Sequence, residues 1–364
     1  MHCASLGEFE QGRPVLEKLK IQNATCKILI TFFSPSGYEV SKQYDGADYI
    51  FYLPMDSQSN AKAFFDIVNP KLILFVKYEF WYYYLAEAGK RNIPLILISG
   101  VFRKDQPFFK WYGDLHRKML SSFQHIFVQN KKSAELLQSL GFANNVTHVG
   151  DTRFDRVIAI AENSQPIPLV EVFIKDHAVI VAGSTWTEDD EELDHFANTN
   201  PDIKFIIAPH DVGKERIDEC KKLYKNSILF SEVNNRDFAT GKNVLIIDNI
   251  GMLSRLYKYA TICYVGGAFG DDGVHNVLEA AVYGKPVVFG PEYEKFIEAE
   301  ELIETGGGYS IENALELEVL LRLLLGKGED FNAAIKASKE YVYSKKGPTD
   351  AIINYIQENR LLTN

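Results

Sequence analysis

Two acidic residues follow apolar segments in the first half of the chain, where they could do acid–base chemistry. Glu8 follows the short apolar segment 1–4 and the turn residue Gly7, and Glu79 follows the apolar run 72–76. Because parallel strands end at the same edge of a sheet, we expect both carboxylates at one edge, where Glu8 could act as a general base. The plainer alternative is that each acid only complements the start of a helix.

Basic residues in the same half suggest two further sites. Arg153 could place a fixed positive charge near the substrate, although a salt bridge with Asp151 or Asp155 is an equal alternative. The segment 107–117 mixes aromatic and basic side chains, which favours either a lipid-binding face or a helix whose aromatic residues pack inward. The candidates for an acceptor or membrane face are Arg13, Lys110 and Trp111.

The second half of the chain carries a glycine pattern typical of a nucleotide-sugar site. Gly266 and Gly267 end an apolar segment, and Asn276 and Glu279 open an expected helix after a loop rich in Gly and Asp. Paired glycines let a ligand approach the backbone, and a helix N-terminus suits a phosphate. Glu279 could then reach a ribose hydroxyl. The alternative is ordinary glycine turns in a βα unit.

Other loops in this half supply the remaining candidates for the same site, because each follows or opens an expected element. For His210 the alternative is a surface-loop histidine, and for Ser184 it is a helix cap. The full set of additional donor-site candidates is Ser184, His210, Asp211, Ile250, Gly251, Met252, Val277 and Leu278.

The elements that must position these residues follow a repeated pattern of short apolar runs and amphipathic stretches. This alternation predicts βαβ units and parallel sheets. The pattern restarts after the polar segment 161–168, so we expect an α/β protein with two Rossmann-like domains facing a cleft. The expected domains are residues 1–160 and 161–344, with a helical tail over residues 345–364 that packs back toward the first domain.

Composition narrows the class of protein. The 364 residues carry a formal charge of −10, but residues 1–150 hold 17 Lys and Arg against 13 Asp and Glu. The acidic total argues against a nucleic-acid binder, and the charge difference between the halves indicates two domains with different partners. The four cysteines form no C-x-x-C pair, so we expect neither a zinc site nor a disulfide framework. We also expect no cofactor and no bound metal ion.

The motifs together resemble those of the bacterial 3-deoxy-D-manno-octulosonic acid (Kdo) transferases of lipid A biosynthesis. This resemblance implies a GT-B fold with an acceptor domain followed by a CMP-Kdo domain. It also implies metal-independent, inverting transfer of Kdo to a lipid A precursor (lipid IVA) in lipopolysaccharide biosynthesis. The matching segments cover nearly the whole chain in order and are SLGE at 5–8, YEFW at 78–81, GDTRFD at 150–155, GSTW at 183–186, APH at 208–210, IDNIG at 247–251, GGAFGDDGVHNVLEAA at 266–281 and FGP at 289–291.

The resemblance also implies roles for individual residues. Glu8 looks like the family's general base, and Glu79 and Arg153 occupy the positions of residues that stabilise the transition state. The segments that resemble the family's CMP-binding segments contain His210 and Asp211, Ile250 to Met252, and Asn276 to Glu279.

The chain departs from the family's pattern at three points. Lys77 stands where the family usually has the first Glu of Glu-x-Glu. His210 stands where it has an Arg, and Arg216 or Lys214 could supply the lost cation. Family members usually begin with a hydrophobic membrane anchor, which we expect to be absent here. The resemblance implies an enzyme at the cytoplasmic face of the bacterial inner membrane, with an anionic membrane surface as a partner.

Two other functions stay open from the residues alone. One is a GT-B enzyme that uses a UDP-sugar, either a transferase or a 2-epimerase. The other is a two-domain protein that binds a ligand without reacting with it. A comparison of CMP and UDP binding separates the first alternative from Kdo transfer, and turnover with CMP-Kdo excludes the second.

Overall fold

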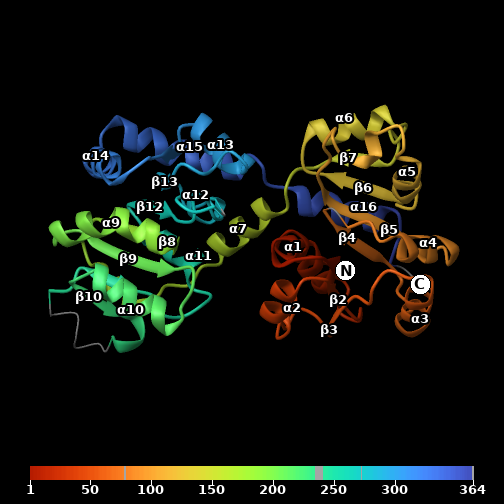
Figure 1. The fold of residues 1–364 in the computed structure, drawn as a ribbon, viewed down its shortest axis with the longest axis horizontal. Helices are drawn as coiled ribbons and strands as arrows, with labels where there is room; N and C mark the ends of the chain where they lie inside the picture. The colour runs from red at the N-terminus through yellow and green to blue at the C-terminus, as the bar shows by residue number, and fades with distance from the viewer. Residues whose placement is uncertain (78, 234–240, 272, 363–364) are drawn as a thin grey trace. The chain divides into compact units, whose positions relative to one another are not determined.

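The chain folds into two compact units, each built on a seven-stranded parallel sheet (Figure 1). The structure is a computed structural model that describes residues 1–77, 79–233, 241–271 and 273–362. Unit 1 comprises Met1–Arg156 and Gly347–Asn364, and unit 2 comprises Val157–Lys346. The prediction of two Rossmann-like domains is therefore confirmed.

Unit 1 has the strand order β3-β2-β1-β4-β5-β6-β7, so the order reverses between β1 and β4. In open α/β sheets, ligands bind at such a reversal, beyond the carboxyl ends of the strands. The strands are β1 His2–Cys3, β2 Leu29–Phe32, β3 Tyr49–Tyr52, β4 Ile73–Val76, β5 Leu95–Gly100, β6 His125–Val128 and β7 Val146–His148. The helices are α1 Leu6–Gln22, α2 Pro35–Ser41, α3 Gln58–Val68, α4 Tyr82–Lys90, η1 Pro107–Phe109, α5 Asp114–Leu120, α6 Lys131–Ser139 and α16 Pro348–Glu358.

The C-terminal helix α16 is part of unit 1, where Figure 1 shows it beside the strands of that sheet. Its buried residues Ile352 and Ile353 share a hydrophobic core with Phe9 of α1. The Asp155 carboxylate accepts hydrogen bonds from the backbone N–H groups of Gly347 and Thr349, both at 2.7 Å. Asp155 therefore stabilises the start of α16.

Unit 2 has the strand order β10-β11-β9-β8-β12-β13-β14, so its order reverses between β8 and β12. The strands are β8 Val179–Thr185, β9 Lys204–Pro209, β10 Ser227–Leu229, β11 Val244–Ile246, β12 Ile262–Val265, β13 Val287–Phe289 and β14 Gly308–Ser310. The helices are α8 Pro168–Ile174, α9 Thr187–Thr199, α10 Lys214–Leu223, η2 Phe230–Glu232, α11 Leu253–Leu256, η4 Tyr257–Tyr259, α12 Leu278–Ala281, α13 Ile297–Glu304, α14 Ala314–Leu325 and α15 Glu329–Tyr343.

The polar segment expected at residues 161–168 is shorter than predicted. Helix α7 (Arg153–Glu162) includes its first two residues, and α8 begins at Pro168. Val157 and Ile158 give α7 a buried apolar side. This side stabilises the helix, which therefore continues into the start of the polar segment. Proline at the first helical position starts α8 because its fixed backbone angle suits a helix start.

Candidate functional site

The two carboxylates predicted to share a sheet edge lie just after the two strands that flank the order reversal of unit 1. Glu8 is in the first turn of α1, directly after β1, and Glu79 follows β4. The two groups are close enough that the charge of Glu79 raises the pKa of Glu8. The structure therefore brings together the two acids that the sequence analysis singled out.

Glu8 is a buried carboxyl with a strongly shifted pKa. Only 7% of its surface is exposed, and burial raises its pKa to about 7. The backbone N–H of Ala4, which donates to Oε2 at 2.5 Å, and the charge of Lys77 act in the opposite direction. Ser5 caps α1, so Glu8 lies at a helix start, as the plainer alternative expected. A carboxyl with a pKa near 7 could also accept a proton at neutral pH, and the role of general base stays a prediction.

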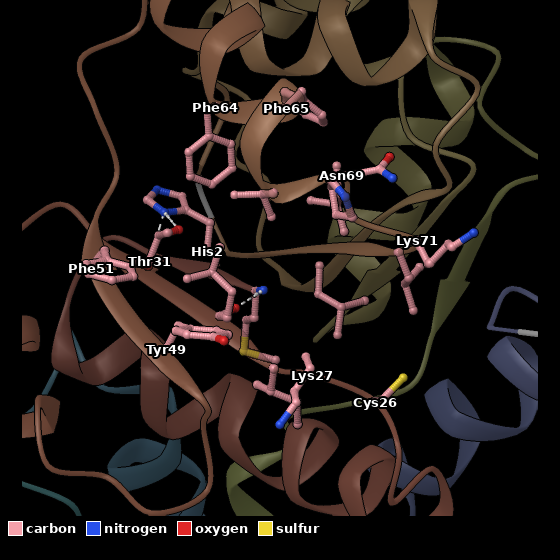
Figure 2. Close-up of a pocket in the computed structure, with 18 of the residues that line it drawn as sticks. His2, Cys26, Lys27, Thr31, Tyr49, Phe51, Phe64, Phe65, Asn69 and Lys71 are labelled. Atoms are coloured by element: carbon pink, nitrogen blue, oxygen red, sulfur yellow. Dashed lines mark hydrogen bonds between the residues drawn. The ribbon is translucent and has the colours of Figure 1, made fainter.

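Glu79 is held by two donors that the sequence analysis did not identify as a group. The Trp81 indole N–H donates to Oε2 of Glu79, and Nε2 of His2 lies 3.2 Å from the same oxygen. Figure 2 shows His2 turned toward Thr31 of β2, whose hydroxyl lies 3.0 Å from Nδ1. The available signal was the position of His2, three residues before the SLGE segment, in the strand that precedes it.

The two cations near these acids have different surroundings. Lys77 follows β4 directly and adopts a left-handed backbone conformation with φ of 65°, and its charge lowers the pKa of Glu8. Arg153 forms the salt bridge given as one alternative, because its Nε and Nη2 both lie 2.8 Å from Oδ2 of Asp151. Asp155, the other partner considered, instead caps α16.

A cavity of about 610 Å³ opens beside Glu79. Its wall is mainly aromatic and apolar, and the lining residues are Phe33, Met55, Asp56, Glu79, Phe80, Trp81, Pro107, Phe108, His116 and Met119. A carboxylate on an apolar wall suits an acceptor that combines a hydroxyl with apolar groups.

A larger cavity, of about 1020 Å³, lies elsewhere in unit 1 and contains none of the predicted catalytic residues (Figure 2). It is lined by the first residues of β2 and β4, including Leu29 and Ile73. The ladders of β1 with both neighbours begin at His2, which pairs with Thr31 and with Phe75.

The residues predicted for a membrane face have mixed surroundings. Trp111 is 90% exposed, whereas Phe108 in the same segment is buried. The aromatic residues of this segment therefore include one that faces solvent and one that packs inward. Arg13 pairs with Glu17 at 2.7 Å and lies over the ring of Tyr44. The structure leaves Trp111 available for a surface contact and gives Arg13 partners within its own unit.

In unit 2, three of the predicted donor loops meet beyond the ends of β8, β9 and β12. The His210 ring stacks on Trp186 and on His275, with centroids 4.6 Å apart in each case. The indole N–H of Trp186 donates to Nε2 of His275 at 3.2 Å. His210 is therefore an exposed loop residue whose ring stacks between those of Trp186 and His275.

Asp189 organises the glycine loop and was missed by the sequence analysis. It is fully buried and accepts hydrogen bonds from the backbone N–H groups of Trp186 and Gly267, at 2.8 and 2.9 Å, and from the hydroxyl of Tyr264 at 2.8 Å. Burial raises the pKa of Asp189. Gly266 is required beside it, since a Cβ there would lie 2.6 Å from the carbonyl oxygen of Ser184. The sequence signal was an acid at the third position of α9.

The helix expected to begin at Asn276 begins later. Helix α12 starts at Leu278 and has four residues, and the Asn276 side chain accepts from the Leu278 N–H at 3.3 Å. Asn276 also donates to Oε1 of Glu279 at 3.2 Å. The predicted helix start at Asn276 is therefore wrong by two residues: this segment is a loop, ordered by the two polar side chains, ahead of a single helical turn. Phosphate binding at this segment stays a prediction.

The remaining donor candidates have simple local roles. Ser184 does not cap a helix, because α9 begins at Thr187, and Asp211 accepts from the Gly213 N–H at 2.9 Å. Ile250 is largely exposed and Met252 precedes α11. The remaining two glycines of the candidate set, Gly251 and Gly267, have positive φ of 91° and 97°.

Arg216 does not replace the missing donor-site cation. Its Nη2 donates to the buried carboxylate of Asp190, which also accepts from the hydroxyl of Tyr224 at 2.9 Å. Breaking such a buried pair leaves an uncompensated charge, so Arg216 is committed to the fold of unit 2. His210, in its stack, remains the side chain at the position where the family has arginine.

The described parts of the chain contain neither a metal-ligand cluster nor a membrane-spanning helix. Across residues 1–77, 79–233, 241–271 and 273–362, no cluster of three or more His, Cys, Asp or Glu side chains is arranged to ligate a metal ion. Within those same ranges, no helix combines the length and the apolar character needed to span a bilayer.

Comparison with known proteins gives consistent results. Residues 1–156 match the family described as 3-deoxy-D-manno-octulosonic-acid transferase (kdotransferase). The chain is 29% identical to a 3-deoxy-D-manno-octulosonic acid transferase of Aquifex aeolicus, over 93% of this chain and 88% of that protein. It is 27% identical to a bifunctional glycosyltransferase/methyltransferase of Fusobacterium nucleatum, over all of this chain and 55% of that longer protein.

Among solved structures, the UDP-GlcNAc 2-epimerase from Neisseria meningitidis bound to UDP-GlcNAc is similar over 98% of both chains, with a TM-score of 0.65 and 17% identity. This likeness confirms the GT-B fold. At 17% identity this likeness concerns the fold alone. The sequence comparisons go further: residues 1–156 match the Kdo transferase family model, and most of the chain is similar to a Kdo transferase of Aquifex aeolicus.

Proposed function

We propose that this enzyme transfers Kdo from CMP-Kdo to a lipid A precursor, with inversion at the anomeric carbon and without a metal ion. The single observation that carries the proposal is the pair Glu8 and Glu79 at the order reversal of unit 1. This pair lies in the segment that matches the transferase family, and Glu8 has a pKa of about 7. The UDP-sugar alternative rests on likeness of fold alone.

In the proposed reaction, Glu8 is the general base. Its carboxylate takes the proton from an acceptor hydroxyl, and the resulting oxygen nucleophile attacks the anomeric carbon of Kdo from the side opposite CMP. The bond from that carbon to the CMP phosphate breaks, and CMP leaves as a phosphate anion that needs no proton. Glu79, on the wall of the adjacent cavity, and Arg153 stabilise the positive and negative charges that develop.

Unit 1 is the proposed acceptor domain, and unit 2 is the proposed donor domain. The donor candidates there are the Gly266-Gly267 turn, the loop from Asn276 to Glu279 and the His210 stack. The N–H groups of Gly266 and Gly267 already donate to Gly183 and Asp189, so a protonated histidine of the stack is the donor proposed for an anionic phosphate. The other residues assigned to this site are Ser184, Asp211, Ile250, Gly251, Met252, Val277 and Leu278.

The proposed setting is the cytoplasmic face of the bacterial inner membrane, where a lipid A precursor would be available. Exposed Trp111 and the adjacent Lys110 are the side chains proposed to contact that anionic surface. The net positive charge of residues 1–150 also favours contact between unit 1 and that anionic surface.

The proposal is tested by offering the enzyme matched donors. With a lipid A precursor present, we expect CMP release from CMP-Kdo and no UDP release from UDP-N-acetylglucosamine. We also expect calorimetry to detect CMP binding that is at least about tenfold tighter than UDP binding, a difference of about 1.4 kcal/mol. Tighter binding of UDP, or turnover of the UDP-sugar, would favour the other GT-B activity.

A further inference from the structure

A chain of buried polar groups connects three adjacent strands beneath the proposed active site. His2, on the central strand β1, is only 3% exposed. Its Nδ1 lies 3.1 Å from the carbonyl oxygen and 3.0 Å from the hydroxyl of Thr31 on β2. Its Nε2 lies 3.2 Å from Oε2 of Glu79, which follows β4. The imidazole therefore joins the strand neighbours of β1 at the order reversal of the sheet.

The contacts specify which ring nitrogen must donate to the carboxylate. Nε2 faces Oε2 of Glu79, to which the indole N–H of Trp81 also donates. A carboxylate oxygen only accepts, so Nε2 must donate to it. At Nδ1, the Thr31 carbonyl oxygen can only accept, whereas the Thr31 hydroxyl can donate or accept. All of these contacts are satisfied when Nε2 carries a proton.

The ring itself is fixed by packing. It meets the edges of Phe75 and Trp81, with centroid distances of 5.4 and 5.3 Å. Because the ring, the indole and the Thr31 contacts are all buried or partly buried, Oε2 of Glu79 has two donors in fixed positions. Such outer contacts are what hold a reacting side chain in a productive geometry.

We propose that His2 is a positioning residue for Glu79: held by Thr31, it donates from Nε2 to the carboxylate and, with Trp81, fixes its orientation. This inference rests on the proposed role of Glu79 in Kdo transfer. It does not require His2 to touch substrate.

A matched pair of variants tests this proposal. In His2→Gln the amide nitrogen lies near the position of Nε2 and keeps a donor for Glu79, whereas in His2→Asn it lies near Nδ1 and cannot reach. We expect His2→Gln to keep kcat within about fivefold of wild type, and His2→Asn to lose about tenfold or more in kcat with an unchanged KM for CMP-Kdo. Equal losses in the two variants, or a change confined to KM, would overturn the proposal.

The double variant with Glu79→Gln separates positioning from general damage to the fold. If His2 acts through Glu79, His2→Asn costs little further activity once Glu79 is changed, whereas a merely structural role makes the two losses multiply. An active Glu79→Gln enzyme would instead remove Glu79 from the reaction and so refute the proposed role of Glu79 rather than its contact with His2.

The contact itself has a readout that does not depend on activity. Nitrogen NMR of the histidine ring in the intact protein should show a proton on Nε2 of His2. An unprotonated Nε2 in the wild-type protein would overturn the inference, because the ring could not then donate to Glu79.

Discussion

The buried carboxyl of Glu8 should make the protein less stable at the pH where it works. Its pKa is raised from 4.5 to about 7, mainly by burial, so the folded state binds this proton more tightly than the unfolded state does. Stability is therefore lost as pH rises from about 4.5 to about 7 and stays lost above that range. A pKa difference of this size corresponds to about 3 kcal/mol.

Replacing Glu8 by Gln removes the titration and keeps an oxygen that can accept from the Ala4 N–H. We expect Glu8→Gln to gain up to about 3 kcal/mol of unfolding free energy over wild type at pH 8, and to gain little at pH 4.5. The same variant should bind CMP normally but lose transfer by at least about two orders of magnitude, because the base is gone.

The assay is urea unfolding of both proteins at pH 4.5, 6 and 8, read by tryptophan fluorescence. Glu135→Gln is the control, since Glu135 is an exposed carboxylate in the same unit. A stability difference between wild type and Glu8→Gln that is the same at all three pH values would refute the burial argument. Near-wild-type turnover of the variant would refute its role as base.

Three further predictions concern a charge beside Glu8, the histidine stack of unit 2 and the cap of α16. Lys77→Gln removes a charge that lowers the pKa of Glu8, so the rising limb of kcat/KM against pH should move to higher pH; an unmoved limb would contradict the coupling. His210→Arg should tighten CMP binding about tenfold in calorimetry if a permanent cation serves the donor phosphate, whereas weaker binding would show that the histidine stack itself is needed. Asp155→Ala should cost about 2 kcal/mol and increase hydrogen exchange in α16, because two backbone N–H groups lose their acceptor; unchanged exchange would mean that apolar packing alone holds that helix.

The alternation of apolar runs and amphipathic helices was enough to predict both sheets, because a buried parallel strand leaves a strong local signal. The juxtaposition of Glu8 and Glu79 could also be predicted, since both follow strands of one sheet. What the sequence could not supply is which neighbours each group meets. The His2 contact with Glu79 joins residues 77 positions apart, and the contact of Asp189 with Gly267 joins residues 78 apart.

The errors in the prediction have local causes. The sequence predicted a helix start at Asn276 and Glu279. The Asn276 side chain instead forms hydrogen bonds with the Leu278 backbone and with Glu279, which delays the helix by two residues. Arg216 was a candidate for the donor-site cation because the sequence does not reveal its partner, Asp190, which is buried on another helix. Sequence spacing is least informative about the contacts of polar side chains whose partners are buried.

The most direct test of the account is the product of a single turnover with CMP-Kdo and a lipid A precursor, compared between wild type and Glu8→Gln. Mass spectrometry and NMR of the acceptor should show added Kdo with inverted anomeric configuration and one CMP released per Kdo in the wild type, and no product in the variant even though it still binds CMP. A product with retained configuration, or equal product from both proteins, would contradict the account.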